Sequence, residues 1–422
     1  MPKNRFSWIP WIYCTPILAG GYFQFLVANY LLKYATDILL LAPAFVGTVF
    51  LVSRLWDAVN DPLIGWFSDF QKKKSGKRKR LIIFSAPVLA LSFLALWYSP
   101  AENKEFWFAF WLIVFFTALT FLYVPHYSLG AELSENMETR LKLFGGRTIS
   151  ENAGVIAGAL MLTILIPLNL VREVTDSLTG VTILAAFIIL LPLFFLKEPE
   201  KKVEVSVSFG ESFKTVLANR QMRWLSSISF LNQIGASVML AASLYFTEYV
   251  MGKKDLGSAV PAIFIISASI CIPIWIHFGK VQLKSFWLIG QFMMTIGVGL
   301  MFFIQYLPYW SIFPASFLVG AGAGSALTYT PAVVAQISET GHDGVFFSIF
   351  TFMNKSGMAV AAFIVGQVLA LTGFLANSIQ SESALSGIKI TFTVIPGFCF
   401  LMAALMIYVF NFKGKKTEPE NQ

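Results

Sequence analysis

Long apolar stretches of about 20 residues alternate with short polar segments over most of the chain. An α-helix rises 1.5 Å per residue, so about 20 apolar residues cross a hydrocarbon core of roughly 30 Å. The pattern predicts twelve membrane-spanning helices, near residues 10–34, 44–66, 81–99, 106–129, 148–167, 181–196, 224–250, 258–279, 286–307, 310–337, 345–373 and 387–411. We therefore expect an all-α, multi-pass integral membrane protein whose first apolar stretch is a retained helix and not a signal peptide.

One long polar segment interrupts the apolar pattern and separates six predicted spans from six. It predicts an N-terminal half at residues 1–196, a central linker at 197–223, a C-terminal half at 224–412 and a tail at 413–422. Two six-helix halves joined by a polar linker are typical of the major facilitator fold, whose halves move about a site near the middle of the membrane.

The composition supports a membrane protein and sets its orientation. Hydrophobic residues make up 56% of the chain and charged residues 13%, whereas a soluble domain carries about 25% charged residues. Lys and Arg concentrate in the N-terminus, in alternate loops, in the linker and in the tail, while the opposite side carries only Lys104, Arg172, Lys253 and Lys254. Because basic loops remain in the cytoplasm, we expect both termini to be cytoplasmic, in an inner or plasma membrane. This topology accounts for the net charge of +8, so no nucleic-acid partner is expected.

No motif of a resident cofactor or of an enzyme is found. The sequence contains no HExxH, no Ser-His-Asp candidate and no phosphate loop, and the three cysteines fall in predicted spans. We therefore expect neither an enzyme nor a cofactor.

The stretch "RLWDAVNDPLIG", residues 54–65, places charges inside the second predicted span. Arg54, Asp57 and Asp61 are three and four residues apart, so they share one face of a helix. An ionised group at mid-bilayer costs about 2.5 to 3.5 kcal/mol on insertion scales, so this face is expected to turn inward. Two carboxylates beside the Asn60 amide oxygen are hard ligands suited to Na⁺, Li⁺ or a proton. They predict a cation site, and a permanent salt-bridge network with Lys355 or other intramembrane charges is the alternative.

Three segments carry a family resemblance. They are "YATDILLLAPAFVGTVFLVSRLWDAVNDPLIGWFSD", "VPHYSLGAELSENMETRLKLFGGR" and "FTFMNKSGMAVAAF". They closely resemble the glycoside-pentoside-hexuronide cation symporters, the family of the melibiose permease, and are also similar to the animal sodium-dependent lysophosphatidylcholine symporters. The resemblance implies a secondary active transporter that couples Na⁺ or H⁺ to the movement of a small solute by alternating access, working as a monomer in the bilayer.

The resemblance also implies a set of site residues. It assigns cation binding to Asp57, Asn60, Asp61, Thr120 and Thr351, with Asp57 and Asp61 as the Na⁺ ligands if the coupling ion is sodium. It assigns substrate binding or coupling to Tyr123, Tyr127, Arg147 and Lys355. The acidic sugar-binding residues of the family's first and fourth helices are replaced by Gly21 and Tyr123, and the stacking tryptophan by Tyr127. Melibiose itself is therefore disfavoured, and we expect another glycoside or a sugar acid, with a lysophospholipid as the alternative and passive facilitation as a second alternative.

The stretch "GWFSDFQKKKSGKRKR" resembles the cytoplasmic loop signature of facilitator proteins. It predicts a gating role for Gly65, which would allow close helix approach, and for Asp69, which would form a latch with the basic run; Arg54 is added to the gating set. Two residues stay open. His126 either hydrogen-bonds a backbone group or titrates near neutral pH, and Glu151 either pairs with Arg147 four residues earlier or serves as a proton site.

Overall fold

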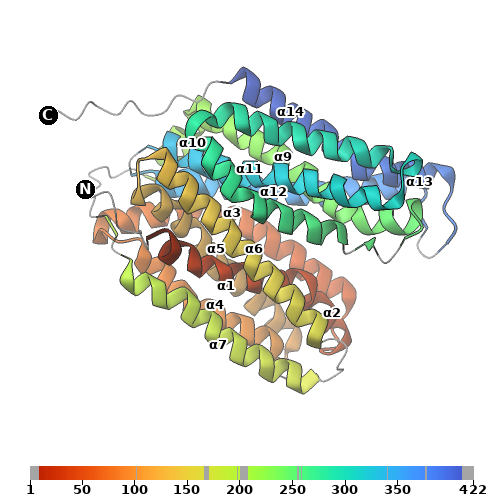
Figure 1. Cartoon of the computed structure of the whole chain (residues 1–422). Coiled ribbons are helices and arrows are strands. Elements are labelled where there is room, and N and C mark those ends of the chain that lie inside the picture. The colour runs from red at the N-terminus through yellow and green to blue at the C-terminus, as the bar shows by residue number, and fades with distance from the viewer. Residues whose placement is uncertain are drawn as a thin grey trace. The chain divides into compact units, whose positions relative to one another are not determined.

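The computed structural model describes residues 9–100, 102–165, 171–196, 198–199, 208–253, 256–257, 259–339, 341–375 and 378–410. Every regular element in these ranges is helical (Figure 1). The predicted tail at 413–422 and part of the predicted linker lie outside the described residues.

Each of the twelve predicted spans falls on a helix. The first six are α1 (Ile9–Asn29) with α2 (Leu31–Asp37), α3 (Pro43–Ser75), α4 (Lys79–Trp97), α5 (Lys104–Leu133), α6 (Met137–Leu165) and α7 (Val171–Phe195). A short helix, α8 (Phe209–Ala218), lies in the predicted linker. The last six are α9 (Arg220–Tyr245) with η2 (Phe246–Val250), α10 (Ala259–Phe302), α11 (Ile312–Ile337), α12 (Asp343–Leu371), and α13 (Glu382–Lys389) with η6 (Ile390–Val394) and α14 (Ile395–Val409). Helix α10 contains two predicted spans, and its helical conformation is broken at Gln282.

By length and composition alone, seven helices of the described chain are apolar enough to cross a membrane. Helices α3 and α6 are also long, with 33 and 29 residues, but they carry the polar side chains that the sequence assigns to the site. The described part of α1 and a stretch of α7 form shorter apolar helices, Ile12–Ala28 and Gly180–Leu190.

The chain divides into two compact units. The first comprises residues 1–214 together with 338–348, and the second comprises 215–337 together with 349–422. The first turns of α12 therefore belong to the first unit, and the remainder of α12 belongs to the second.

In the first unit α1 packs against α6 and α7, α4 packs against α5 and α7, and α3 packs against α5. Glycines bring α1 and α6 together: a Cβ at Gly21 would collide with the backbone oxygen of Glu151, and one at Gly154 would collide with that of Leu18. Such close backbone approach is how membrane helices pack without a hydrophobic driving force between them.

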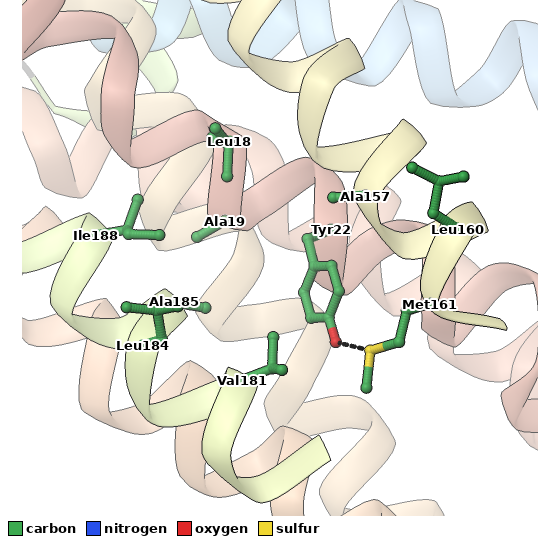
Figure 2. A pocket seen from close by; sticks show the side chains of 10 residues that line it. All are labelled: Leu18, Ala19, Tyr22, Ala157, Leu160, Met161, Val181, Leu184, Ala185 and Ile188. Atoms are coloured by element: carbon green, nitrogen blue, oxygen red, sulfur yellow. Dashed lines mark hydrogen bonds between the residues drawn. The ribbon is translucent and has the colours of Figure 1, made fainter. Parts of the chain in front are cut away.

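An apolar cavity of about 530 Å³ lies among α1, α6 and α7 (Figure 2). Leu18, Ala157, Leu184 and Ile188 are among its lining residues, and at one end the Tyr22 hydroxyl donates a hydrogen bond to Met161 Sδ at 2.5 Å. Because its lining offers almost no polar surface, this cavity is unsuited to a cation or a sugar.

In the second unit α10 packs against α11, and α14 packs against α9 and α10. The "GAGAG" stretch at 320–324 lies in this packing, where a Cβ at Gly322 would collide with the backbone oxygen of Gly290. The glycines thus serve close helix contact, as their small size predicts.

Candidate functional site

The carboxylates of α3 meet a hydroxyl of α5 inside the first unit. The side chains of Asp57 and Asp61 are 2% and 0% exposed, and Asn60 is also buried. Thr120 Oγ1 lies 2.9 Å from Asp57 Oδ1 and 3.1 Å from Asp61 Oδ1. The structure therefore brings together three of the four residues of this unit for which cation binding was predicted, Asp57, Asp61 and Thr120; we call these three the carboxylate cluster.

The chemistry of the carboxylate cluster suits a small hard cation. A threonine hydroxyl carries one hydrogen, so Thr120 can donate to only one of the two carboxylates at a time. Two carboxylates this close also repel each other when both are ionised, and a proton or a cation between them relieves that repulsion. The Asn60 Nδ2 atom is buried and has no hydrogen-bond partner among the described residues.

Arg54 lies on the same helix, one turn before Asp57. It is half-buried, and its guanidinium carbon is 4.4 Å from the centre of the Phe116 ring. This cation–π contact holds the Arg54 guanidinium against α5. The gating role of Arg54 stays a prediction.

A second polar group surrounds Arg147 on α6. Arg147 is 1% exposed; its Nη1 donates to Glu151 Oε2 at 2.8 Å, and its guanidinium carbon lies 3.6 Å from the centre of the Tyr127 ring and 5.0 Å from that of Tyr123. The Tyr123 hydroxyl in turn donates to Gln24 Oε1 at 3.3 Å. The predicted substrate residues of this unit, Tyr123, Tyr127 and Arg147, therefore lie together.

The guanidinium of Arg147 is only partly used by the protein. Within the described part of the chain, its Nε and Nη2 are buried and have no hydrogen-bond partner. These two N–H groups lie on the same edge of the guanidinium, the edge that pairs with both oxygens of a carboxylate or phosphate. The Nε and Nη2 groups of Arg147 can therefore donate two parallel hydrogen bonds to a carboxylate or phosphate, while the Tyr127 ring stacks on the guanidinium plane.

The close packing of α1 explains why residue 21 carries no acid. The backbone of Glu151 occupies the space that a Cβ at Gly21 would need, and a Cβ at Gly20 would press on the Tyr123 ring. A carboxylate at position 21 would separate α1 from α6. In this unit Glu151 of α6 supplies the carboxylate beside Arg147 instead.

A network of buried charges lies where α3 ends and α4 begins. Arg78 Nε donates to Glu132 Oε1 at 2.6 Å, Nη1 to Ser68 Oγ at 2.8 Å and Nη2 to Asp69 Oδ1 at 2.5 Å. Burial alone would lower the pKa of the Arg78 guanidinium, but the charges of Glu132, Asp69 and Asp343 raise it, so the side chain stays protonated.

The same network holds the start of the linker. Glu198 accepts hydrogen bonds from the backbone N–H groups of Arg78 and Lys79 at 2.6 and 3.1 Å, and Lys72 Nζ lies 3.0 Å from Glu198 Oε1 and 2.9 Å from Glu132 Oε2. The sequence analysis missed the roles of Glu132 and Glu198. Neither residue carried a signal of its own in the sequence, because each is a single acidic residue in a segment predicted to be cytoplasmic.

Asp69 and Gly65 contact the first turns of α12. Asp69 Oδ1 and Oδ2 accept hydrogen bonds from the backbone N–H groups of Gly344 and Val345 at 2.7 and 3.0 Å. The Asp69 carboxylate thus bonds N–H groups in the first turn of α12 that have no partner within that helix, and its negative charge complements the positive end of the α12 dipole. A Cβ at Gly65 would lie 2.5 Å from the Gly344 oxygen, so glycine is required there. Their gating function stays a prediction.

Thr351 and Lys355 lie on α12 in the second unit. Thr351 is buried and Lys355 is half-buried. Their predicted cooperation with the carboxylate cluster stays a prediction.

The two residues left open by the sequence have partners in the structure. His126 Nε2 lies 2.7 Å from the backbone oxygen of Tyr13, and the two rings stack at 4.1 Å between centres. Glu151 forms the i, i+4 ion pair with Arg147. Both observations favour the structural interpretation of these side chains.

The sequence matches curated relatives over most of its length. It is 25% identical over 410 residues to the Inner membrane symporter YicJ of Escherichia coli, covering 90% of this chain and 86% of that protein. It is 24% identical to the Glucuronide carrier protein homolog of E. coli, with 92% and 88% covered. It is 21% identical to Sodium-dependent lysophosphatidylcholine symporter 1 of Xenopus tropicalis, with 91% and 83% covered.

The fold is also shared with a solved transporter. The structure of the E. coli fucose:proton symporter FucP superposes with a TM-score of 0.66 at 14% identity, covering 96% of this chain and 99% of FucP. The model of the family described as MFS/sugar transport protein matches residues 12–414. The predicted fold and the prediction that the chain is not an enzyme are thereby confirmed: the chain belongs to the MFS/sugar transport protein family and is an integral membrane transporter of the major facilitator superfamily.

Proposed function

We propose that the chain is a symporter that couples a monovalent cation, Na⁺ or H⁺, to the transport of a glycoside or sugar acid by alternating access. The carboxylate cluster is the observation that carries the proposal. A channel or passive facilitator has no use for two buried carboxylates one helical turn apart, because their desolvation is costly and serves no coupling.

In this proposal Asp57 and Asp61 hold the cation, and Thr120 and Asn60 complete its oxygen ligands. Cation entry removes the repulsion between the carboxylates, so it favours the conformation in which they are closest. Lys355 and Thr351 of α12 take part in coupling, as the resemblance implies. The site favours hard cations over soft metal ions because all the ligand atoms are hard oxygens.

The solute binds beside Arg147 and Tyr127. The Nε and Nη2 edge of Arg147, which has no hydrogen-bond partner among the described residues, supports a solute with a carboxylate. The relative named a glucuronide carrier protein homolog is consistent with a sugar acid. The protein works as a monomer in the inner membrane with both termini cytoplasmic, and Gly65, Asp69 and Arg54 serve the gate.

The first experiment identifies the ligand and the ion. Thermal unfolding of the purified full-length protein is measured with glycosides, sugar acids and lysophospholipids, each with and without Na⁺ and at two pH values. A true ligand gives a saturable rise in unfolding temperature, following RT ln(1 + [L]/Kd). A sugar or sugar acid whose shift grows with Na⁺ or with protons supports the proposal, and the absence of any such shift contradicts it.

The second experiment tests the carboxylate cluster with a matched pair of threonines on α5. Thr120→Val removes the shared hydroxyl, whereas Thr117→Val removes one whose partners are Trp56 and the Ile113 backbone. We expect cation affinity to fall about tenfold, about 1.4 kcal/mol, in Thr120→Val only. Equal cation affinity in both variants would contradict the assignment.

A lysophospholipid is the second candidate solute. The relative named for lysophosphatidylcholine favours it, and the Arg147 edge can bind a phosphate as well as a carboxylate. The apolar cavity of α1, α6 and α7 (Figure 2) would accept an acyl chain. Saturable stabilisation by lysophospholipid, with none by sugars, would select this candidate.

A further inference from the structure

A polar face of α9, in the second unit, is used by neither the predicted cation site nor the predicted solute site. Within the stretch "SSISFLNQIGAS", residues 226–237, Ser229, Asn232 and Gln233 are spaced three and four residues apart. They therefore share one face of a helix. Amides and hydroxyls on a membrane helix turn away from lipid, because hydrocarbon offers them no hydrogen bonds.

This face packs closely on α12. Ser229 Oγ donates to Asn354 Oδ1 at 2.6 Å. A Cβ at Gly357 would lie 2.9 Å from Gln233 Cβ and 3.1 Å from the Phe230 backbone oxygen, so glycine allows the two helices to approach. The crossing places Ser229 in contact with Asn354, one helical turn before Asn232 on α9.

Asn232 is the unusual member of this face. Both of its side-chain polar atoms, Nδ2 and Oδ1, are buried and lack a hydrogen-bond partner among the described residues. Its neighbours are bonded: Gln233 Nε2 donates to Ser237 Oγ at 3.0 Å, and Ser229 donates to Asn354. A buried amide with neither bond made destabilises the fold, so a partner from outside the chain is expected for it.

The depth of Asn232 matches that of a transported solute. It lies eight residues after residue 224, where the predicted span 224–250 begins, which is about 12 Å along the helix and toward the middle of a core of roughly 30 Å. Transporters of this fold bind their solutes near the bilayer midplane. Lys355 lies ten residues after residue 345, where the predicted span 345–373 begins, which is about 15 Å along α12.

We propose that Asn232, positioned by the Ser229–Asn354 contact, is a binding subsite for hydroxyl groups of a polyhydroxylated solute. An amide offers a donor and an acceptor side by side, and two adjacent hydroxyls of a sugar offer the complementary pair. This inference rests on the proposed function and adds to it, because the resemblance assigns no sugar recognition to Asn232. A lipid chain would leave the amide unpaired, so the subsite favours a glycoside or sugar acid over a lysophospholipid.

The test compares four forms of the full-length protein: wild type, Asn232→Leu, Asn232→Ser and Ser243→Ala. Asn232→Leu keeps a similar volume and removes both polar atoms, and Ser243, bonded to the Leu240 backbone, is the matched control on α9. Binding of methyl glycosides and free sugar acids, and of their single-deoxy analogues, is measured calorimetrically at fixed Na⁺ and pH.

We expect Asn232→Leu to lower the affinity at least tenfold, about 1.4 kcal/mol, and Ser243→Ala to leave it unchanged. One deoxy analogue should show the same loss in wild type and no further loss in Asn232→Leu, because the missing hydroxyl and the missing amide are partners. The unfolding temperature of Asn232→Leu without ligand should equal or exceed that of wild type, because an unsatisfied amide is removed.

The outcomes separate this inference from the proposed function. Failure of wild type to bind any glycoside or sugar acid overturns the proposed function. Binding by wild type, with equal affinity in Asn232→Leu, overturns the subsite alone and assigns the amide to an internal water. A lower unfolding temperature in Asn232→Leu together with additive deoxy effects also overturns it, because the amide would then be structural. The milder Asn232→Ser variant, which retains one hydroxyl, should fall between wild type and Asn232→Leu in affinity.

Discussion

Arg78 and Arg147 are both buried in the first unit, with exposures of 0% and 1%, yet their guanidinium groups differ in how many hydrogen bonds they form. All three nitrogen groups of Arg78 donate to side chains, those of Glu132, Ser68 and Asp69. Arg147 donates only from Nη1, to Glu151, and keeps Nε and Nη2 without partners among the described residues. Burial alone therefore does not tell a structural arginine from a functional one.

The difference lies in how complete each set of bonds is. A fully bonded guanidinium holds α3, α4 and α5 together, and any ligand would have to break existing ion pairs to reach it. A guanidinium with two unbonded N–H groups can bind a ligand without breaking an existing ion pair. The free energy of removing these N–H groups from water is spent during folding and does not oppose binding. The comparison predicts that Arg78 contributes to stability and Arg147 to binding.

The largest effect is expected at Arg78. Arg78→Ala leaves the carboxylates of Glu132 and Asp69 buried without that counter-charge, which costs about 3 to 5 kcal/mol of the free energy of unfolding. Unfolding of the purified protein in detergent, followed by temperature or denaturant, measures it. A change below about 1 kcal/mol would remove the distinction between the two arginines.

At Arg147 the large effect should appear in binding. Arg147→Lys keeps the charge but loses the two-pronged edge, so affinity for an anionic solute should fall about 100-fold, about 2.8 kcal/mol. The unfolding temperature should change little, because a lysine ammonium can still pair with Glu151, whose side chain is 25% exposed, and can still lie over the Tyr127 ring. A large loss of stability with unchanged affinity would make Arg147 a second structural arginine.

A smaller effect is expected where α1 meets α6, the contact that sets the surroundings of Arg147. Gly21→Ala forces a methyl group against the Glu151 backbone, and overpacking of this kind costs about 1 to 3 kcal/mol. Gly47→Ala is the control, because nothing lies within 4 Å of its Cβ position, and it should be neutral or slightly stabilising. If both variants unfold alike, the close contact between α1 and α6 is wrong.

The smallest effect is expected at the exposed ion pair of Lys142 and Glu138, whose side chains are 48% and 43% exposed. Glu138→Gln should change the free energy of unfolding by less than about 0.5 kcal/mol and leave binding unchanged. The variant is thus the baseline against which the buried arginines are judged. A loss of solute binding in it would show that binding responds to charge changes remote from Arg147.

The polar face of α3 could be predicted from the sequence, because charged residues are rare in an apolar helix. Arg54, Asp57 and Asp61 are three and four residues apart, so they must share one face of that helix. Asp57 and Asp61 could be paired on this ground alone, whereas Thr120 needed the resemblance, since a threonine on an apolar helix carries no signal of its own. The spans were also predictable, because length and hydropathy decide them.

Other features depend on contacts that a linear pattern does not contain. Arg78 was indistinguishable from the neighbouring basic residues of its loop, and only its bonds to Ser68, Asp69 and Glu132 set it apart. Gly21 was interpreted as a lost acid, although its backbone contact with α6 is what requires glycine. Asn232 was overlooked because an uncharged amide does not stand out among the charges of the spans.

The most direct test of the account is cation-driven accumulation in proteoliposomes. Uptake of the solute found by thermal shift is followed under an inward gradient of the coupling ion, for wild type, Asp57→Asn, Asp61→Asn and the control Glu138→Gln. The account predicts that wild type and Glu138→Gln concentrate the solute above the external level, while both aspartate variants lose accumulation. Unchanged uphill uptake in both aspartate variants would contradict it.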